Sequence, residues 1–198
     1  MNKRIIGLTG GIATGKTTVA NYLASAYHLP ILDADIYARD AVSIGSPILS
    51  AIAQRYGAQI LLPDGNLNRQ KLGEIIFTHP DERNWVENLI HPYVGDRFLK
   101  AITESSTPTL VLVIPLLFES QMDILVTEIW VVFCSESQQL QRLIHRNHLN
   151  QEQAEARIKS QMPIAEKAVR ANVVLDNSFT LEDLLKQVDT ALEKVSPK

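Results

Sequence analysis

The octapeptide GGIATGKT, residues 10–17, decides the fold of this chain. It matches the phosphate-loop pattern G-x-x-x-x-G-K-[ST]. The apolar run at residues 4–9 before it predicts a buried strand, and residues 17–24 after it predict a helix. The residues expected on the inward face of that helix are Val19, Leu23 and Ala26. A strand, a glycine loop and a helix in this order are typical of a nucleoside triphosphate site.

The residue types of the loop explain why it would bind phosphate. Glycines allow backbone angles that direct successive N–H groups toward one centre, and the helix that begins near Lys16 adds its partial positive charge there. The Lys16 ammonium can reach the β- and γ-phosphates, and the Thr17 hydroxyl is placed to bind Mg²⁺. The predicted nucleotide-binding residues of the loop are Gly10, Gly11, Ile12, Ala13, Thr14, Gly15, Lys16, Thr17 and Thr18.

The composition is that of an ordinary globular protein, with 198 residues, 45% hydrophobic and 21% charged. A net charge of −3 argues against a general nucleic-acid binder, which is usually basic. Cys134 is the only cysteine, so a disulfide framework or a cysteine-based zinc site within one chain is excluded. The N-terminus shows no signal-peptide pattern and no apolar run approaches membrane-spanning length. We therefore expect a cytoplasmic protein with neither a membrane nor a nucleic-acid partner.

Five short apolar runs, separated by helical stretches, predict the architecture. The runs are residues 4–9, 29–33, 109–114, 129–134 and 172–176. The helical stretches are residues 34–43, 47–56, 68–104, 136–146, 150–170 and a last helix capped by Thr180, with helix boundaries expected at His79-Pro80 and His91-Pro92 and a tight turn at 61–66. Such alternation indicates an α/β fold, a five-stranded parallel sheet with helices on both faces, whose ligands bind at the carboxyl ends of the strands.

Asp33 closes the second predicted strand, at the γ-phosphate end of the loop. A carboxylate there can accept the proton of an attacking hydroxyl or orient it. Asp33 and Asp35 also precede a helical stretch, so a helix cap is the alternative role.

Arg142 and Arg146 lie four residues apart on one predicted helix, the spacing at which two side chains reach one target. With Arg157, Lys159 and Lys167 nearby, they fit a lid that neutralises charge on a transferring phosphoryl group. A solvated helix surface is the alternative interpretation of each of these residues.

The third strand favours a kinase over a GTPase or a motor-type ATPase. It is followed by the sequence PLLFE, residues 115–119, and lacks the Asp-x-x-Gly of GTPases.

The ordered set of motifs resembles the dephospho-CoA kinase family. The motifs are residues 7–12, Asp33-Ala34-Asp35 with Arg39, Arg69 with Phe77, residues 89–92, residues 115–119, Arg142 with Arg146, Arg157-Ile158, Ser160-Gln161 and Asp176-Asn177. The similarity spans roughly residues 5–177. The loop is shared by many kinases, whereas the later motifs in this order are much more specific.

This resemblance implies transfer of the ATP γ-phosphate to the ribose 3′-hydroxyl of dephospho-CoA, with Mg²⁺. It implies that Asp33 is the general base, that Lys16 and Arg142 stabilise the phosphoryl group, and that Thr17 is the metal ligand. Arg146 and Asn177 would contact the nucleotide. The implied substrate-binding residues are Asp33, Asp35, Arg39, Arg69, Phe77 and His91, although His91 is also suited to capping or core packing.

The resemblance also implies a division of the chain into three parts. These are a three-layer P-loop core at residues 1–59, 106–136 and 170–198, a helical substrate domain at 60–105, and a lid at 137–169. We expect one chain to act as a monomer or weak homo-oligomer on a small-molecule substrate.

Four positions depart from the family pattern. Val113 stands where an acidic residue is common, so Asp33, Asp35 or water would have to order the Mg²⁺. Ala13 stands where glycine is common, Ser178-Phe179 replaces the x-Gly that usually follows Asn177, and Asn147 replaces an acidic residue.

Two other functions compete with this one. The first is a P-loop kinase for another small metabolite, such as a nucleoside or a sugar. The second is a nucleotide-sensing module that binds ATP without turnover, against which the presence of both Asp33 and Arg142 argues.

Overall fold

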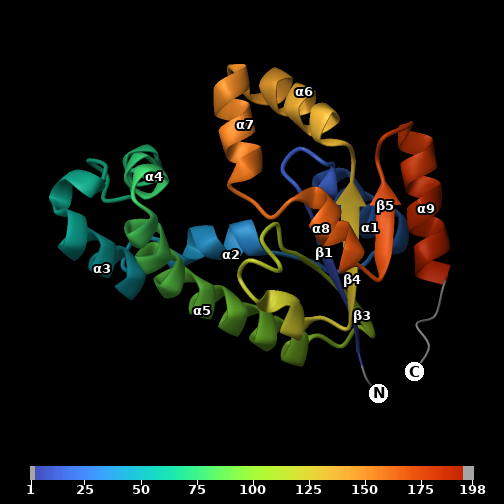
Figure 1. Ribbon diagram of the computed structural model, residues 1–198. Coiled ribbons are helices and arrows are strands. Elements are labelled where there is room, and N and C mark those ends of the chain that lie inside the picture. The colour runs from blue at the N-terminus through green and yellow to red at the C-terminus, as the bar shows by residue number, and fades with distance from the viewer. Residues whose placement is uncertain (1–2, 194–198) are drawn as a thin grey trace. The chain divides into compact units, whose positions relative to one another are not determined.

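The computed structural model describes residues 3–193, and its centre is a five-stranded parallel sheet (Figure 1). The strand order is β2-β3-β1-β4-β5, and every pair of neighbours is parallel. The strands are β1 Arg4–Gly10, β2 Ile31–Asp33, β3 Thr109–Val113, β4 Glu128–Phe133 and β5 Val173–Asp176. The predicted α/β class and five parallel strands are confirmed.

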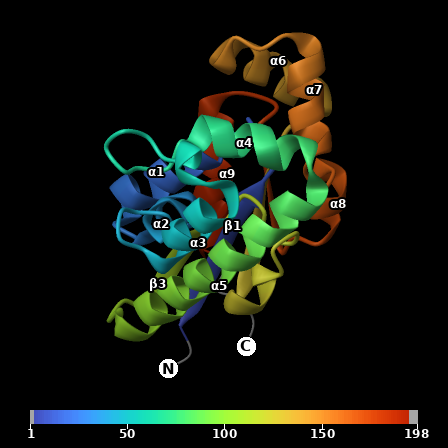
Figure 2. The ribbon, with the colours of Figure 1, turned by 90° about the vertical axis from the view of Figure 1, so that its left-hand side faces the viewer.

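Helices connect the strands. They are α1 Lys16–Tyr27, α2 Ala34–Ala41, α3 Pro47–Tyr56, α4 Arg69–Thr78, α5 Pro80–Glu104, α6 Glu136–Asn147, α7 Gln151–Lys159, α8 Ile164–Val169 and α9 Leu181–Glu193, with short 3₁₀ turns η1 Ala58–Ile60 and η2 Met122–Leu125. Helices α1 and α9 pack on one face of the sheet and α8 packs on the other, against β1 and β4 (Figures 1 and 2). This is the arrangement that right-handed crossovers produce when the chain adds β2 and β3 on one side of β1 and then β4 and β5 on the other.

The described residues form two compact units. The first runs up to Asp33 and resumes at Ser105, and the second is Ala34–Glu104. The first unit holds the sheet, α1 and α6 to α9. The division falls at the end of β2, whereas the sequence analysis placed the start of the helical domain at residue 60.

The core of the first unit lies between the sheet and the helices α1 and α9. Inward side chains of β1 and β4, such as Leu8 and Trp130, are fully buried there. They meet Val19 and Leu23 of α1. Because these two α1 residues are buried directly after the phosphate loop, core packing holds the end of that loop in place. The prediction that Ala26 faces inward is wrong, since Ala26 lies exposed in the last turn of α1.

The second unit is helical and has a core of its own, which includes Ile52 of α3, Leu72 of α4 and Val86 of α5. The turn predicted at residues 61–66 is present, closed by the bond from Leu62 N to Asn66 O, with one bridge between Leu61 and Leu67.

Two helix predictions are wrong in detail. Helix α5 continues through His91-Pro92, where a boundary was expected, because Val86, Val94 and Phe98 on both sides of the proline are buried. That packing outweighs the hydrogen bond lost at Pro92. The stretch 150–170 is two helices, α7 and α8, separated by residues 160–163. Among residues 3–193, no helix is long and apolar enough to cross a membrane.

Candidate active site

The phosphate loop joins β1 to α1, and backbone geometry requires two of its glycines. Gly10 has φ +151°, and a Cβ there would lie 2.5 Å from Val132 O. Gly15 has φ +106°, and a Cβ there would lie 2.3 Å from the side-chain nitrogen of Asn177. Gly15 is the N-cap of α1 and provides no side-chain cap, so the positive end of the helix is open to an anion.

Two features of the loop backbone stand out: the contacts of its carbonyls with Lys16 and the left-handed conformation of Ala13. The Lys16 Nζ donates to Gly11 O at 2.7 Å and to Gly10 O at 3.2 Å, so the ammonium lies over the loop. A phosphate oxygen carries negative charge and is therefore a stronger acceptor for this ammonium than a carbonyl oxygen. Ala13 has φ 60°, a left-handed conformation that costs a residue with a side chain about 1–2 kcal/mol.

Asn177 directly follows β5, Arg142 lies on α6, and both are connected to the loop. Asn177 donates from Nδ2 to Thr14 O at 2.7 Å. Arg142, on α6, donates from Nη2 to Asn177 O at 2.8 Å. These bonds bring the predicted phosphate-stabilising arginine to the same edge of the sheet as the loop. Arg146 is exposed and donates from Nε to Asn147 Oδ1 at 2.9 Å; of the described residues, none of the loop bonds to it.

Asp33 ends β2 and is half-buried. It lies opposite Val113 of β3, which in turn lies opposite Leu8 of β1. Two strand spacings place its Cα about 10 Å from Leu8, at the sheet edge where the loop begins. Asp35 lies in the first turn of α2, where a carboxylate also complements the helix dipole.

Oxygen donors available for Mg²⁺ are few. The Thr17 and Thr18 side chains are exposed in the first turn of α1, and Asp33 and Asp176 are carboxylates that end strands at the same edge of the first unit. Val113 is buried in the sheet and offers no carboxylate. Among the described residues there is no cluster of three histidine, cysteine or acidic side chains that could hold a metal. A hydroxyl and a carboxylate together with phosphate oxygens suit Mg²⁺, which takes few protein ligands beside phosphates.

Five of the six predicted substrate residues lie in the second unit, whereas Asp33 ends the first segment of the first unit. Arg39 and Arg69 line one cavity of about 570 Å³, and Arg69 Nη2 donates to Arg39 O at 3.4 Å. Phe77 and His91 are not among the described residues that line this cavity. Phe77 is 68% exposed on α4, and His91 is half-buried in α5. Thus two of the predicted substrate residues come together.

Cys134 is not a nucleophile. It is fully buried at the end of β4, and burial raises the pKa of its thiol. A raised pKa disfavours the reactive thiolate.

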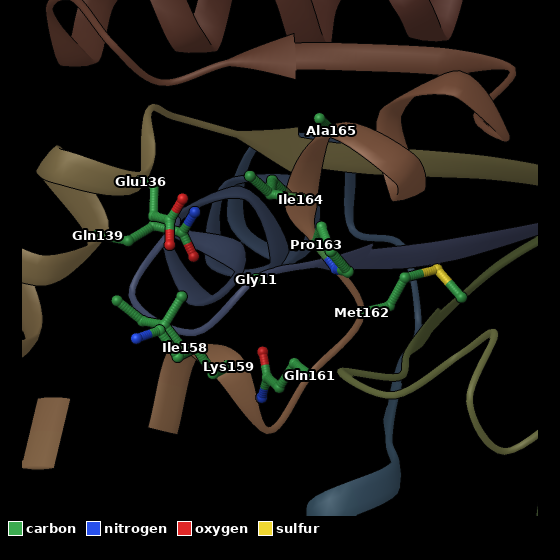
Figure 3. A pocket seen from close by; sticks show the side chains of 10 residues that line it. All are labelled: Gly11, Glu136, Gln139, Ile158, Lys159, Gln161, Met162, Pro163, Ile164 and Ala165. Carbon is green, nitrogen blue, oxygen red and sulfur yellow. The ribbon is translucent and has the colours of Figure 1, made fainter. Parts of the chain in front are cut away.

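Two residues of the quoted motifs, Gln161 and Glu119, received no individual role from the sequence and contact the loop or its supports. Lys167, expected either among the lid cations or on a solvated surface, is instead fully buried on α8. Gln161 accepts a hydrogen bond from Ile12 N at 2.9 Å, and Glu119 and Lys167 form an ion pair at 2.8 Å. Figure 3 shows Gln161 on the segment between α7 and α8, beside a cavity of about 280 Å³ that Gly11 and Gln139 also line. The Ser160-Gln161 and Pro-Leu-Leu-Phe-Glu motifs, both part of the family resemblance, were the features of the sequence that could have identified Gln161 and Glu119.

Comparison with known proteins identifies the family. The dephospho-CoA kinase family model matches residues 4–183. A dephospho-CoA kinase of Trichormus variabilis is 77% identical over 192 residues, which cover 97% of this chain and 98% of that protein. The chain belongs to the dephospho-CoA kinase family.

Solved structures agree with this membership. A dephospho-CoA kinase from Campylobacter jejuni is 26% identical and gives a TM-score of 0.73 over 98% of both chains. A Thermus thermophilus protein is 30% identical and gives a TM-score of 0.83 over 100% of both chains. The prediction of a P-loop kinase for the final step of coenzyme A biosynthesis is therefore confirmed, whereas the roles of individual residues in this dephospho-CoA kinase family member stay predictions.

Proposed function

We propose that Asp33, Lys16 and Arg142 carry the transfer of the ATP γ-phosphate to the ribose 3′-hydroxyl of dephospho-CoA. Asp33 accepts the proton of the 3′-hydroxyl while the oxygen of that hydroxyl bonds to the γ-phosphorus. The bond between the γ-phosphorus and the β,γ-bridging oxygen breaks, which releases ADP. Lys16 and Arg142 neutralise the charge that the transferring group and the leaving ADP carry.

The observation that carries this proposal is the convergence of the three residues on one sheet edge. Lys16 already spans the loop, and Arg142 is tied to Thr14 of the loop through Asn177. Asp33 ends the strand two positions away in the same sheet. Carboxyl ends of parallel strands are where α/β sheets bind ligands, so these groups can act on one phosphoryl group.

The residues at this edge fit Mg²⁺ as the cation that accompanies ATP. The Thr17 hydroxyl would hold it, together with the Asp33 carboxylate from the same edge of the sheet. A bound Mg²⁺ neutralises phosphate charge during transfer. With Val113 in the sheet, no carboxylate from β3 contributes.

The second unit supplies the acceptor site in this proposal. Arg39 and Arg69 line one cavity and carry the positive charge that suits the phosphates of dephospho-CoA. Asp35, Phe77 and His91 complete the proposed substrate-binding set. We place the enzyme in the cytoplasm as a monomer or weak homo-oligomer, which light scattering of the purified protein tests.

The direct test is a coupled assay for ADP with Mg-ATP and dephospho-CoA, in which mass spectrometry identifies the product. We expect ADP formation that depends on dephospho-CoA and a product heavier by one phosphate. Phosphorylation of a nucleoside or sugar in preference to dephospho-CoA would point to another metabolite kinase. ATP binding without transfer to any alcohol would point to a nucleotide-sensing module.

A further inference from the structure

Residues 160–163 form the hinge between α7 and α8, and two hydrogen bonds tie it to other loops of the first unit. Ile12 N, in the phosphate loop, donates to Gln161 Oε1 at 2.9 Å. Met162 N donates to Glu119 Oε1 at 2.9 Å. Adjacent hinge residues are therefore fixed to two different loops, the one after β1 and the one after β3 (Figure 3).

The Glu119 contact is backed by a buried charge. Lys167 of α8 is 0% exposed, and its Nζ lies 2.8 Å from Glu119 Oε1. The same Nζ donates to Pro115 O at 2.9 Å, a carbonyl that also accepts from Thr9 Oγ1 at 3.2 Å. A buried ammonium is costly unless paired and hydrogen-bonded, so this geometry is held tightly. The ion pair thereby locks the hinge beside Gln161.

The bond from Ile12 to Gln161 acts on the peptide that holds Lys16. Gly11 C=O and Ile12 N–H belong to one planar peptide group. The N–H end binds Gln161, and the C=O end accepts from Lys16 Nζ at 2.7 Å and from Thr14 Oγ1 at 2.9 Å. Because the group is planar, fixing its N–H fixes the direction of its carbonyl. The hinge therefore sets the orientation of the Lys16 contact.

We infer that Gln161 is a positioning residue that orients the Gly11–Ile12 peptide, and through it Lys16, for the triphosphate, and that the Lys167–Glu119 ion pair holds Gln161 in place. This inference rests on the proposed role of the loop in ATP binding. It deepens that role by making the end of the lid a structural part of the phosphate site.

The test compares Gln161→Met, which keeps the size of the side chain and removes the acceptor, with the wild type. We expect ATP affinity, measured by calorimetry without dephospho-CoA, to fall about tenfold, the effect of one lost hydrogen bond at the site. Amide exchange at Ile12 should accelerate, while exchange at Val19 in α1 stays unchanged. Neither ATP affinity nor amide exchange is measured with dephospho-CoA present. The test therefore stays valid even if dephospho-CoA proves not to be the substrate.

The matched control is Gln151→Met, at the exposed start of α7 in the same lid. We expect its ATP affinity and Ile12 exchange to equal those of the wild type. ATP affinity unchanged in Gln161→Met, or an Ile12 amide that stays protected, would overturn the inference.

A second test asks whether Lys167 acts through Gln161. We expect Lys167→Met to weaken ATP binding, and Lys167→Met with Gln161→Met to bind ATP no more weakly than Gln161→Met alone. Independent, additive losses would contradict the proposed order. If Lys167→Met does not fold because Glu119 is left unpaired, Lys167→Met with Glu119→Leu removes both charges and takes its place in the same cycle.

Discussion

At Ala13 the phosphate loop adopts a left-handed backbone, with φ 60°. Glycine is common at this position in the family pattern, and the structure supplies the physical reason. A side chain in this conformation contacts the following carbonyl oxygen and costs about 1–2 kcal/mol. The protein carries this strain in a loop whose neighbours Gly10, Gly11 and Gly15 have no side chains.

Ala13→Gly should therefore stabilise the protein. Relief of about 1–2 kcal/mol of strain exceeds the roughly 0.5–1 kcal/mol that glycine costs in backbone entropy, which leaves a gain of about 0.5 kcal/mol. Urea unfolding measures it. The control is Ala24→Gly in the middle of α1, where a regular helical residue should lose about 1 kcal/mol. A loss of stability in Ala13→Gly would contradict the strain argument.

Asp33→Asn should lower turnover about a hundredfold or more, because the amide cannot accept the proton of the attacking hydroxyl. ATP affinity should stay near that of the wild type, since the loop supplies the phosphate contacts. Steady-state rates and calorimetry on the same preparation separate the two effects. Asp40→Asn, an exposed acid of the second unit, is the control and should keep normal turnover. A folded Asp33→Asn with normal rates would exclude Asp33 as the base.

Among the elements, α9 is held at its carboxyl end by Arg4 of β1. The Arg4 guanidinium donates to Leu192 O at 2.9 Å and to Ala191 O at 3.2 Å, and its Nε pairs with the largely buried Glu128 of β4. One side chain thus caps a helix and joins two strands to it. A cation at a helix carboxyl end is also favoured by the helix dipole.

Arg4→Met should destabilise the protein by about 3 kcal/mol, because the largely buried Glu128 then loses the ion pair with Arg4. Thermal unfolding of Arg4→Met and of Arg4→Met with Glu128→Gln measures this. The double variant should recover part of the loss, since the neutral amide is less costly to bury. A double variant that is less stable than Arg4→Met would show that the buried charge is not the cause.

In the second unit, α3 and α5 are joined by the Arg55–Glu82 ion pair. Arg55 donates to both carboxylate oxygens of Glu82, at 2.7 and 2.8 Å, and Tyr56 OH donates to the same carboxylate. These bonds, those of Arg55 above all, lower the pKa of Glu82 from 4.5 to about 2. The Arg55 guanidinium also lies over the Trp85 ring, 4.4 Å from its centroid.

Because the folded pKa of Glu82 lies below its unfolded value, the ion pair adds stability above pH 4.5, and that stability is lost as the pH falls toward 2. We expect Glu82→Gln to be less stable than the wild type near neutral pH and the difference to shrink between about pH 5 and pH 3. Urea unfolding across this range measures it. Asp81→Asn, the exposed neighbour, should leave the pH dependence unchanged. A difference that stays constant with pH would exclude an electrostatic origin.

At the scale of the whole molecule, the chain contains two units with separate cores. Leu23 belongs to the core of the first unit and Ile52 to that of the second, and both are fully buried. The phosphate loop, Asn177 and Arg142 all lie in the first unit. We therefore expect substitutions in the core of the first unit to affect ATP binding and substitutions in the core of the second unit to affect binding of dephospho-CoA.

Ile52→Ala should destabilise the second unit by about 2–5 kcal/mol through the cavity that it leaves. ATP affinity should stay within about twofold of the wild type, because Ile52 and the phosphate loop belong to different units with separate cores. The KM for dephospho-CoA should rise. Leu23→Ala is the comparison. It should weaken ATP binding, because Leu23 packs α1 against the sheet and α1 begins at Lys16 of the phosphate loop. Equal effects of both substitutions on ATP affinity would show that the two cores act as one.

Local patterns in the sequence were enough to predict the class of fold and the strand, glycine loop and helix at residues 4–27. The strand, glycine loop and helix are contiguous, so residues 4–24 specify the phosphate site by themselves. The apolar runs of the other strands identify a parallel sheet because both of its faces are buried. Cap residues such as Ser46 and Ser135 begin helices where the pattern predicts them, and both accept a backbone N–H bond.

Contacts between distant segments were decided by the tertiary structure alone. Gln161 meets Ile12 across 149 positions, and Arg4 meets Leu192 across 188. The continuation of α5 through Pro92 likewise depends on burial that local propensity does not contain. A sequence pattern reports the preferences of neighbours along the chain, whereas these contacts exist only after the sheet has brought separate segments together. For that reason the strand, glycine loop and helix were predictable from the sequence, and the network that supports the loop was not.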